Sequence, residues 1–356
     1  MLRNRFLETL QETLQLIAEV KTTQMKPTIL DVAERAQVSK ATVSRVLNRN
    51  PQVKDEIRDR VLRVIEELGY RPNAFARNLA TNRTSMIGLI LPDITNPYFP
   101  VLARGIEDAA HRLGYGLFIS NSDNDPKREQ EYIYKMVEQQ VGGVVLISST
   151  LDEETVHDLI GLKTPIVLCD RLIAGTPFDT VTIDDYKAAY DAVHYLIRKG
   201  HARIAHLAGP KNIHSADNRK RGYLDAMRDA GLEPFVSVGS FSFESGVHQM
   251  GSVLDEYAPT ALFASNDLLA LGAMQVVRRR GLRVPEDVAV IGCDDIPFAL
   301  MSHPQLSTIS IPVYQIGVTA VQLLDDQMKG VRSGTKNVIM EHKLIHRESC
   351  GGVEPK

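Results

Sequence analysis

Two long cations and a set of small polar side chains lie close together between positions 39 and 48. Lys40 and Arg45 can each donate to O6 and N7 of guanine, whereas Ala41 offers only apolar contact, for instance to a thymine methyl group. Three small polar side chains around them suit phosphate oxygens: Thr42, Ser44 and Asn48. Such chemistry needs a helix that presents these residues together on one face.

The surrounding pattern predicts that helix within a group of three. Thr28 is placed to cap a first helix, with Asp31 three positions later completing a weak capping box. Residues 37–38 form a turn, and Ser39 caps a second helix that starts near Lys40. We expect these residues to form the shared core: Val32, Ala33, Ala36, Val43, Val46, Leu47, Ile57, Val61, Leu62, Ile65 and Leu68, with Gly69 just past the third helix.

This arrangement predicts a helix-turn-helix whose second helix enters the major groove of DNA. An ordinary helical hairpin with a solvated charged face is the alternative that periodicity alone leaves open. The longer string DVAERAQVSKATVSRVLN, followed by GYRPN at 69–73, resembles the headpiece of the LacI/GalR family of bacterial repressors. Gln37 departs from that pattern, because the family commonly has Gly there, and a positive φ is costly for Gln.

Residues 72–80 follow the headpiece and predict a helix of about two turns, too short to be stable alone. A linker with residual helicity is the alternative. The resemblance implies a hinge helix that folds on operator DNA, where Leu79 wedges between base steps of the minor groove and Arg77 lies near phosphates. The residues expected at the DNA are Thr28, Ser39, Lys40, Ala41, Thr42, Ser44, Arg45, Asn48, Asn73, Arg77 and Leu79.

Charge is distributed unevenly along the chain. Residues 26–84 hold twelve Lys or Arg against seven Asp or Glu, a net charge of +5, and residues 1–25 balance. The whole chain carries −3, so residues 85–356 carry −8. A basic head on an acidic body suits binding to the phosphate backbone through one end.

Length and composition indicate a multidomain cytoplasmic protein. A chain of 356 residues is too long for one ordinary hydrophobic core. It contains no run of 18 apolar residues, so no membrane span is predicted. Cys169 and Cys293 lie in apolar runs and are expected to be buried thiols, which fits a reducing compartment. We expect these domains: extension 1–25, headpiece 26–71, hinge helix and linker 72–84, effector-binding and dimerisation domain 85–350, and tail 351–356.

The extension 1–25 has apolar residues at helical spacing but also three Glu, and it lacks the continuous apolar core of a secretory signal. The family's headpiece normally begins almost at the N-terminus, which corresponds here to Met25. Two interpretations remain: a start assigned upstream or a disordered extension, which we favour, and a genuine extra helix for self-association.

From residue 86 onward, continuous apolar runs alternate with amphipathic stretches. Such runs predict parallel strands covered by helices on both faces, and there are too many for one sheet. We therefore expect an α/β body of two lobes with a cleft between them. The predicted strands are 86–91, 116–120, 143–148, 165–169, 180–183, 203–208, 261–265 and 288–292. The predicted helices are 101–113, 127–140, 186–199, 216–230, 243–256 and 268–280.

Polar residues follow several of these strands, and ligands of open α/β sheets bind at the carboxyl ends of strands. Carboxylates, amides and an Arg suit sugar hydroxyls, and aromatic rings can stack on an apolar sugar face. Asp123 and Asp185 have an equal claim to be caps of the following helices. The body also resembles the type I periplasmic sugar-binding fold, the effector domain of the same family, so that the likeness covers essentially residues 28–350.

The resemblance identifies eight effector contacts through the strings NPYF, DR, RxxGY, NDLLALGA and GCDD. They are Asn96, Tyr98, Phe99, Asp170, Arg171, Arg219, Asn266 and Asp294. For Arg219 the alternative is a solvated charge in a basic run. Ile311 stands where the family commonly has Gln, which argues against a ribose-like ligand and predicts a less polar or differently shaped pocket floor. Gln315, four residues later, is the alternative source of that amide group.

These observations predict a DNA-binding transcriptional regulator, most simply a repressor of a carbohydrate-related operon with a sugar or sugar-like effector. The expected partners are palindromic operator DNA, the effector, and a second copy in a homodimer, with a tetramer left open. A regulator that answers to a phosphorylated protein partner is the alternative, and a sugar receptor without DNA function lacks support beside a complete headpiece. No catalytic, cofactor or metal motif is present, although the pairs 184–185 and 294–295 are adjacent acids.

Overall fold

The computed structural model describes residues 27–47, 50–70, 85–148, 151, 153–162, 164–171, 176–331 and 334–351. The chain divides into two compact units, Met1–Arg83 and Thr84–Lys356. Within the described ranges no helix is long and apolar enough to cross a bilayer. The expected extension 1–25 and hinge 72–84 lie outside the described residues, as do four predicted DNA contacts: Asn48, Asn73, Arg77 and Leu79.

The first unit contains helices α2 (Ile29–Arg35), α3 (Lys40–Leu47) and α4 (Asp55–Leu68). The predicted capping box is confirmed, because Thr28 and Asp31 exchange side-chain-to-backbone hydrogen bonds. Ser39 Oγ accepts from the backbone N–H of Thr42 at 3.1 Å, as predicted for the second cap. Gly69 ends α4 in the left-handed conformation, with φ of 59°.

The core of this unit follows the predicted spacing with few differences. The buried side chains come from the three helices and the segments beside them: Val32, Ala33, Ala36, Val43, Val46, Val53, Val61 and Val64. Val53, in the loop before α4, was not predicted. Leu62 was expected inside but is 47% exposed, and Val64 lies inside instead. Positions 57, 61, 64 and 68 advance by four, three and four residues and share one helix face, whereas 62 falls one residue beyond it. Gln37, in the turn between α2 and α3, has the left-handed backbone conformation with a φ of 53°, as its alignment with a Gly position predicts.

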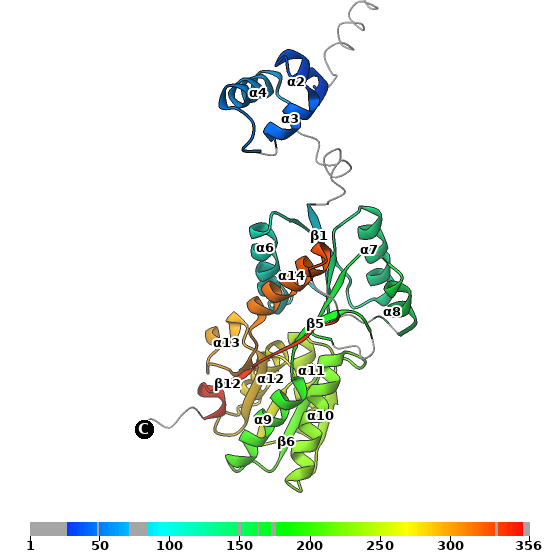
Figure 1. Ribbon diagram of the computed structural model, residues 1–356. Coiled ribbons are helices and arrows are strands. Elements are labelled where there is room, and N and C mark those ends of the chain that lie inside the picture. Colours follow the sequence, from blue (N-terminus) through cyan, green and yellow to red (C-terminus); the bar gives the residue numbers. More distant parts are fainter. Residues whose placement is uncertain are drawn as a thin grey trace, which may run out of the picture. The chain divides into compact units, whose positions relative to one another are not determined.

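The second unit begins with a six-stranded sheet of order β11-β5-β4-β3-β1-β2, which forms the N-terminal lobe. Its strands are β1 (Met86–Leu91), β2 (Gly116–Asn121), β3 (Val144–Ile147), β4 (Ile166–Cys169), β5 (Asp179–Ile183) and β11 (Asn337–Met340). Helices α6 (Tyr98–Arg112) and α14 (Val313–Lys329) cover one face of this sheet, and α7 (Pro126–Glu138) and α8 (Glu153–Ile160) cover the other (Figure 1).

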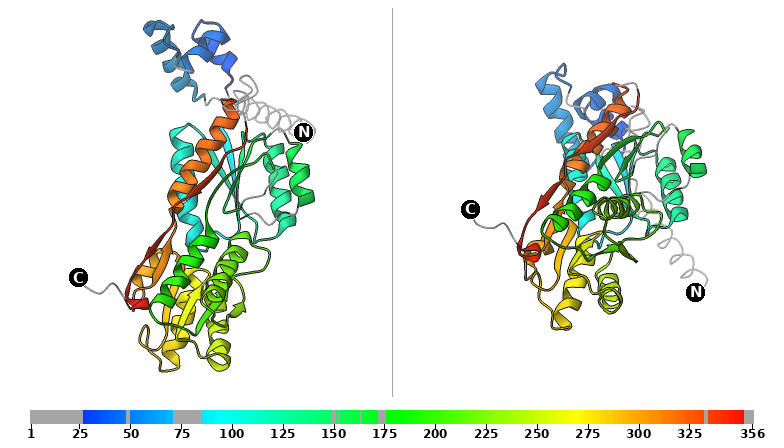
Figure 2. Two further views of the ribbon diagram at one scale, coloured as in Figure 1. Left: turned by 60° about the horizontal axis from the view of Figure 1, so that its bottom comes forward. Right: turned by 90° about the horizontal axis from the view of Figure 1, so that it is seen from below.

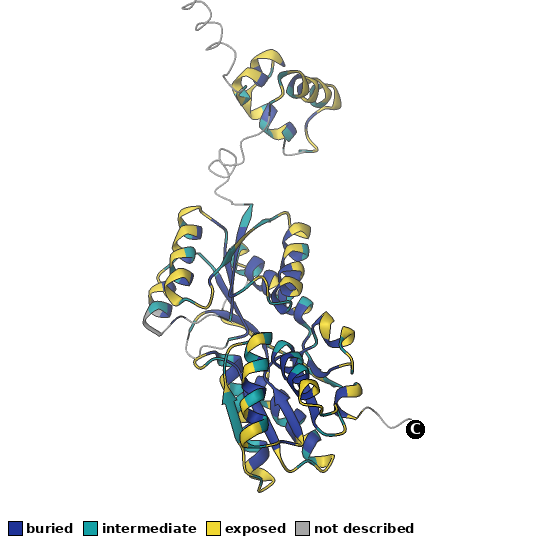
Figure 3. Ribbon diagram, turned by 180° about the vertical axis from the view of Figure 1, so that it is seen from behind, coloured by how far each residue is buried: buried dark blue, intermediate teal, exposed yellow. Residues whose placement is uncertain are grey.

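Alternation along β1 explains why both faces are covered. Ile87 and Leu89 belong to the core that includes α6 and α14, whereas Ile90 packs with Ile133 and Met136 of α7. Successive side chains of a strand point to opposite faces, so a continuous apolar run fills two cores at once. The inner strands of the sheet are accordingly buried while the outer faces of the helices are exposed (Figure 3).

The C-terminal lobe repeats this plan with a sheet of order β12-β10-β9-β8-β6-β7. Its strands are β6 (Ile204–Ala208), β7 (Phe235–Val238), β8 (Ala261–Ala264), β9 (Ala289–Asp294), β10 (Ser307–Ser310) and β12 (Lys343–Ile345). Its helices are α9 (Asp185–Arg198) and α10 (His214–Asp229) on one face, α11 (Phe243–Glu256) and α12 (Asp267–Arg279) on the other, and the short α13 (Pro297–Met301).

The chain passes between the lobes three times, between β5 and α9, between β10 and α14, and between β11 and β12. Figure 2 shows the last pair, in red, running from one lobe to the other. The predicted two-lobed α/β architecture with parallel sheets is confirmed, apart from β12, which pairs antiparallel with β10. The prediction omitted β7, β10, β11, β12, α8, α13 and α14.

Candidate functional site

In the first unit, the predicted base-reading side chains lie on one accessible face of α3. Lys40, Ala41 and Arg45 are exposed, and Val43 and Val46 anchor the opposite face in the core. Neither the Lys40 nor the Arg45 side chain forms a hydrogen bond or ion pair with any residue that the structure describes. Their donors are therefore available to an external acceptor such as a base edge or a phosphate.

In the second unit, segments at the carboxyl ends of seven strands, β1, β3, β4, β6, β7, β8 and β9, converge between the lobes. A small cavity of about 40 Å³ is lined by Asn96, Tyr98, Phe99, Ser148, Asp170, Ser215, Arg219, Phe241, Asn266 and Asp294. Seven of the eight predicted effector contacts are thus neighbours. The eighth, Arg171, is half-buried and does not line this cavity. Their role as ligand contacts stays a prediction.

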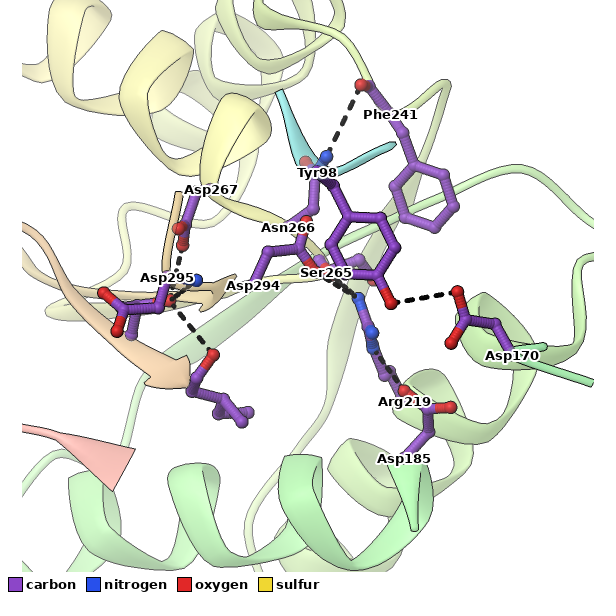
Figure 4. Close-up of polar contacts among 12 residues, drawn as sticks. Tyr98, Asp170, Asp185, Arg219, Phe241, Ser265, Asn266, Asp267, Asp294 and Asp295 are labelled. Atoms are coloured by element: carbon purple, nitrogen blue, oxygen red, sulfur yellow. Dashed lines mark hydrogen bonds and ion pairs between the residues drawn. The ribbon is translucent and has the colours of Figure 1, made fainter. Parts of the chain in front are cut away.

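Arg219 lies at the centre of this cluster, reaching in from α10 (Figure 4). Its Nε donates to Asp185 Oδ1 at 2.8 Å, and its Nη1 donates to the Ser265 carbonyl at 2.6 Å. A longer contact of 3.5 Å joins Nη1 to Asp294 Oδ1. Arg219 is only 6% exposed, so it is not a solvated member of the basic run 219–221. Burial opposes its charge, but the neighbouring acids raise the pKa of Arg219 well above its usual value.

Asp170 follows β4 in the N-terminal lobe and accepts a hydrogen bond of 2.9 Å from the Tyr98 hydroxyl. Burial raises the pKa of Asp170 to about 7, and the charge of Asp185 adds to that shift. The hydrogen bond from Tyr98 and the charge of Arg219 act in the opposite direction. This carboxyl group therefore exchanges its proton near neutral pH and can either donate to or accept from a ligand.

Asp294 follows β9 and lies in the C-terminal lobe, on a backbone with φ of 119°, while Asp295 has φ of 60°. Such angles are strained for residues other than Gly and persist only where surroundings enforce them. Arg347 Nη2 donates to Asp295 Oδ1 at 2.6 Å, and the buried Asp267 accepts from the Ile296 N–H at 2.9 Å. Burial raises the pKa of Asp294 to about 7, against the effect of the Arg219 charge.

Two predicted contacts also hold local backbone. Asn266 caps α12, where its Oδ1 accepts from the Leu269 N–H at 2.9 Å, and Asn96 Oδ1 accepts from the Tyr98 N–H at 3.1 Å in the turn before α6. Both bonds use only the amide oxygen, so each side chain keeps an NH₂ group that can donate. The Asn266 NH₂ group makes one long contact of 3.4 Å with the Phe241 carbonyl.

Neither of the two acids proposed as helix caps, Asp123 and Asp185, is the cap of the following helix. Asp184, rather than Asp185, caps α9 by accepting from the Lys187 N–H. Asp125, rather than Asp123, caps α7. Asp185 is instead the main partner of Arg219, a role that the prediction missed because the two residues meet only when α9 packs on α10.

Larger cavities adjoin the central one. A cavity of about 280 Å³ shares Asn96, Phe99, Ser148 and Phe241 with it. Another, of about 250 Å³, shares Tyr98 and Asp294 and is also lined by Ile311 and Gln315. Ile311 is buried, and it lines this cavity but neither of the two cavities that Phe241 lines.

Three lining residues escaped the sequence prediction: Ser148, Ser215 and Phe241. Ser148 was the last residue of a predicted strand, so the rule that ligands bind at strand ends could have identified it. Phe241 follows β7, which was not predicted, and Ser215 begins α10 without a recognisable motif. The cleft thus gains an aromatic wall from the C-terminal lobe.

Comparisons with known proteins agree with this division. Residues 28–73 match the family model "Bacterial regulatory proteins, lacI family", and residues 193–350 match "Periplasmic binding protein-like domain". Catabolite control protein A of Priestia megaterium is 39% identical over 331 residues, which cover 91% of this chain and 99% of the relative. The chain belongs to the LacI family of bacterial regulatory proteins. It is a DNA-binding transcriptional regulator and not an enzyme.

Two solved structures of LacI-type proteins extend the comparison. The lac repressor dimer bound to operator and the anti-inducer ONPF has a TM-score of 0.84 and 28% identity, covering 91% of this chain and 99% of that one. The complex of the transcriptional regulator CelR with cellobiose has a TM-score of 0.69 and 33% identity, with the same coverage of both chains. Both likenesses span headpiece and body together.

Proposed function

We propose that this LacI-family protein is a repressor of a carbohydrate-related operon and that a sugar or sugar-like effector in the interlobe cleft sets its affinity for DNA. The observation that carries the proposal is the convergence of seven predicted contacts on one cavity between the lobes. Paired acids, amide groups and the rings of Phe99 and Phe241 suit the hydroxyls and the apolar face of a sugar. The relative CelR binds cellobiose in its solved complex.

The DNA end of the proposal rests on α3. Lys40 and Arg45 are exposed donors, and Ala41 between them presents a methyl group. Ser39, Thr42 and Ser44 surround them with hydroxyl groups, although the Ser39 Oγ already accepts the capping bond from Thr42. In the proposal, Lys40, Ala41 and Arg45 therefore read bases, and the hydroxyl groups contact phosphates.

Control by the effector follows from linkage. A ligand that binds both lobes favours their closed arrangement, and it changes DNA affinity only by its differential affinity for the two states. Asp185 lies at the first passage between the lobes and holds Arg219, and Arg347 follows the third passage and holds the turn beside Asp294. Both passages are thus joined directly to the cavity, so closure and ligand contact are coupled.

A second copy completes the proposed regulator. The C-terminal lobe has a broad groove of about 770 Å³ flanked by α12 and α13, where Phe298 and Met301 are 49% and 74% exposed. Such an apolar surface suits a homodimer, and two headpieces would then contact a palindromic operator. The lac repressor, a structural neighbour, is a dimer on its operator. A regulator of this kind acts in the cytoplasm, where bacterial DNA lies.

No described contact favours a phosphorylated protein partner over a sugar. On α6 and α14, the helices that share one flank of the N-terminal lobe, Arg104 already pairs with Asp108 and Lys329 with Asp325. These cations are thus engaged by acids of their own helices. The sugar proposal therefore stands as the simpler one.

The test combines ligand and DNA. Purified protein is screened by thermal shift with neutral sugars, and each hit is added to an anisotropy titration of labelled palindromic DNA. The proposal predicts a hit that stabilises the protein and changes the apparent Kd for DNA, with Lys40→Ala losing preference between operator variants. A protein that binds DNA with equal affinity at every hit concentration would contradict it.

A further inference from the structure

The central cavity holds more carboxylates than cations. Asp170, Asp185 and Asp294 are each at least nine-tenths buried around it, and Arg219 is the sole cation among the described residues that line it or the 280 Å³ cavity beside it. One guanidinium cannot neutralise three acids. The described part of the cleft is therefore acidic in character.

The charge of Arg219 is already offset by the protein. Its shortest contacts go from Nε to the Asp185 carboxylate and from Nη1 to the Ser265 carbonyl, and the contact of Nη1 with Asp294 is 3.5 Å long. The Nη2 group makes no hydrogen bond with a described residue, but it belongs to a cation that two buried acids already flank. A phosphate that reached Nη2 would therefore also meet the charges of Asp185 and Asp294.

The two less well compensated acids belong to opposite lobes. Asp170 follows β4 of the N-terminal lobe and has the Tyr98 hydroxyl as its donor, and Asp294 follows β9 of the C-terminal lobe (Figure 4). Both line the same cavity, so closing the lobes brings like charges together. Burial raises the pKa of both acids, as expected for carboxylates that lack full compensation.

We propose that the effector is an uncharged or cationic ring whose hydroxyl or amino donors bridge Asp170 and Asp294, and that phosphorylated or carboxylated ligands are rejected by the cleft. This inference rests on the proposed function, since it specifies the charge class of the effector of that same site. Each donor forms a hydrogen bond to one carboxylate and stabilises its buried charge, and so offsets the repulsion that opposes closure. An anion would add to that repulsion in a site shielded from water.

The neighbouring walls fit such a ring. Phe99 and Phe241 line both cavities and offer apolar faces there, and Ser148 and Asn96 add neutral polar groups to both. Pro210 and Ile213 continue the apolar lining outward. The specificity of the site therefore comes from carboxylates that accept from ligand donors at the centre and from apolar contact at the edge.

The experiment compares ligands that differ only in charge. Calorimetric titrations at pH 7.5 use the series D-glucose, D-glucosamine, D-glucuronate and D-glucose 6-phosphate, the pair D-ribose and D-ribose 5-phosphate, and cellobiose. We expect the phosphate or carboxylate to weaken binding of any accepted sugar at least tenfold and the amine to change it less than threefold. Anionic forms that bind as tightly as neutral ones would overturn the inference and leave a sugar effector intact.

Two variants separate charge from shape. Asp294→Asn keeps the size of the side chain and removes one acid. The anion penalty, which is the ratio of the Kd of an anionic sugar to that of its neutral form, should therefore fall at least threefold. Ser215→Ala, a change at the same cavity without loss of charge, should leave that penalty as it is. A penalty that Asp294→Asn does not alter would show that rejection is steric, which contradicts the charge argument.

A final arm needs no sugar. Inorganic phosphate at 20 mM should raise the melting temperature no more than sodium chloride of equal ionic strength in Lys40→Ala/Arg45→Ala, a variant with a weakened DNA-reading face. A saturable rise specific to phosphate would refute anion rejection. If none of the sugars binds while phosphate also has no effect, the sugar effector fails and the acidic cleft is supported.

Discussion

Replacing Asp170 by Asn should make the stability of the effector body less sensitive to pH. The carboxyl group is 9% exposed, and its pKa is raised from 3.8 to about 7, chiefly by burial. The amide has nearly the same shape, and its oxygen can still accept from the Tyr98 hydroxyl, which now donates to Asp170 at 2.9 Å. The change therefore removes a charge without opening a cavity.

The sign follows from proton linkage. Because the folded-state pKa of Asp170 is raised, its stabilising contribution is complete below the unfolded value of 3.8 and is lost as the pH rises to about 7. Between pH 5 and 7 the folded state holds up to one proton more, so the free energy of unfolding falls by at most about 1.4 kcal/mol per pH unit. The total is about 2 kcal/mol over the window, because the group is half ionised at pH 7. Asp170→Asn lacks this loss.

Urea unfolding followed by far-ultraviolet circular dichroism at pH 5, 6 and 7 measures the difference, since the chain has no Trp for fluorescence. The variant should gain about 2 kcal/mol in free energy of unfolding over the wild type between pH 5 and 7. Asp255→Asn is the control, because exposed Asp255 pairs with Arg280 and that hydrogen bond lowers its pKa. A difference between Asp170→Asn and wild type that is equal at pH 5 and 7 would refute the reasoning.

Four further substitutions test packing and backbone geometry in the two units. On α11, Gly246→Ala should destabilise the body by about 2 kcal/mol, because the added Cβ would lie 2.3 Å from a backbone carbonyl oxygen of α12. On the same helix, the Cβ of Gly251→Ala meets no atom within 4 Å, so this change should stabilise the body by about 0.5–1 kcal/mol. Gln37→Gly should raise the free energy of unfolding of the headpiece by about 1 kcal/mol, and so its melting temperature, because φ is 53° at this position. A lowered melting temperature would contradict the strain argument. Arg347→Met should cost about 2–4 kcal/mol in urea unfolding, because it leaves the partly buried Asp295 without its cation; a loss under 0.5 kcal/mol would show that other contacts hold the turn.

Much of the fold was predictable because its signals are local. Continuous apolar runs such as 86–91 predict strands buried on both faces, and polar residues just after them converge because parallel strands end at one edge. The headpiece was predictable from caps and spacing, with Leu62 as the exception. There, two adjacent apolar positions competed for one helix face, and only packing decides between them.

The omitted elements lack such signals. Strands β11 and β12 lie at sheet edges with half-exposed side chains, and their pairing joins segments more than thirty residues from any partner strand in the same sheet. The Asp185–Arg219 pair likewise depends on α9 packing against α10. Such contacts are products of tertiary structure, so motifs located Arg219 at the site without revealing which acid holds it.

The central claim is that a ligand in the body changes how tightly the headpiece holds DNA. Anisotropy titrations of a labelled palindrome, with and without a saturating thermal-shift hit, test it most directly. The account predicts a change in apparent Kd of about 5- to 150-fold, the usual range of coupling between sites, and its loss when Arg219→Met removes the cation at the cavity. An identical Kd with and without a ligand that calorimetry shows to be bound would contradict the account.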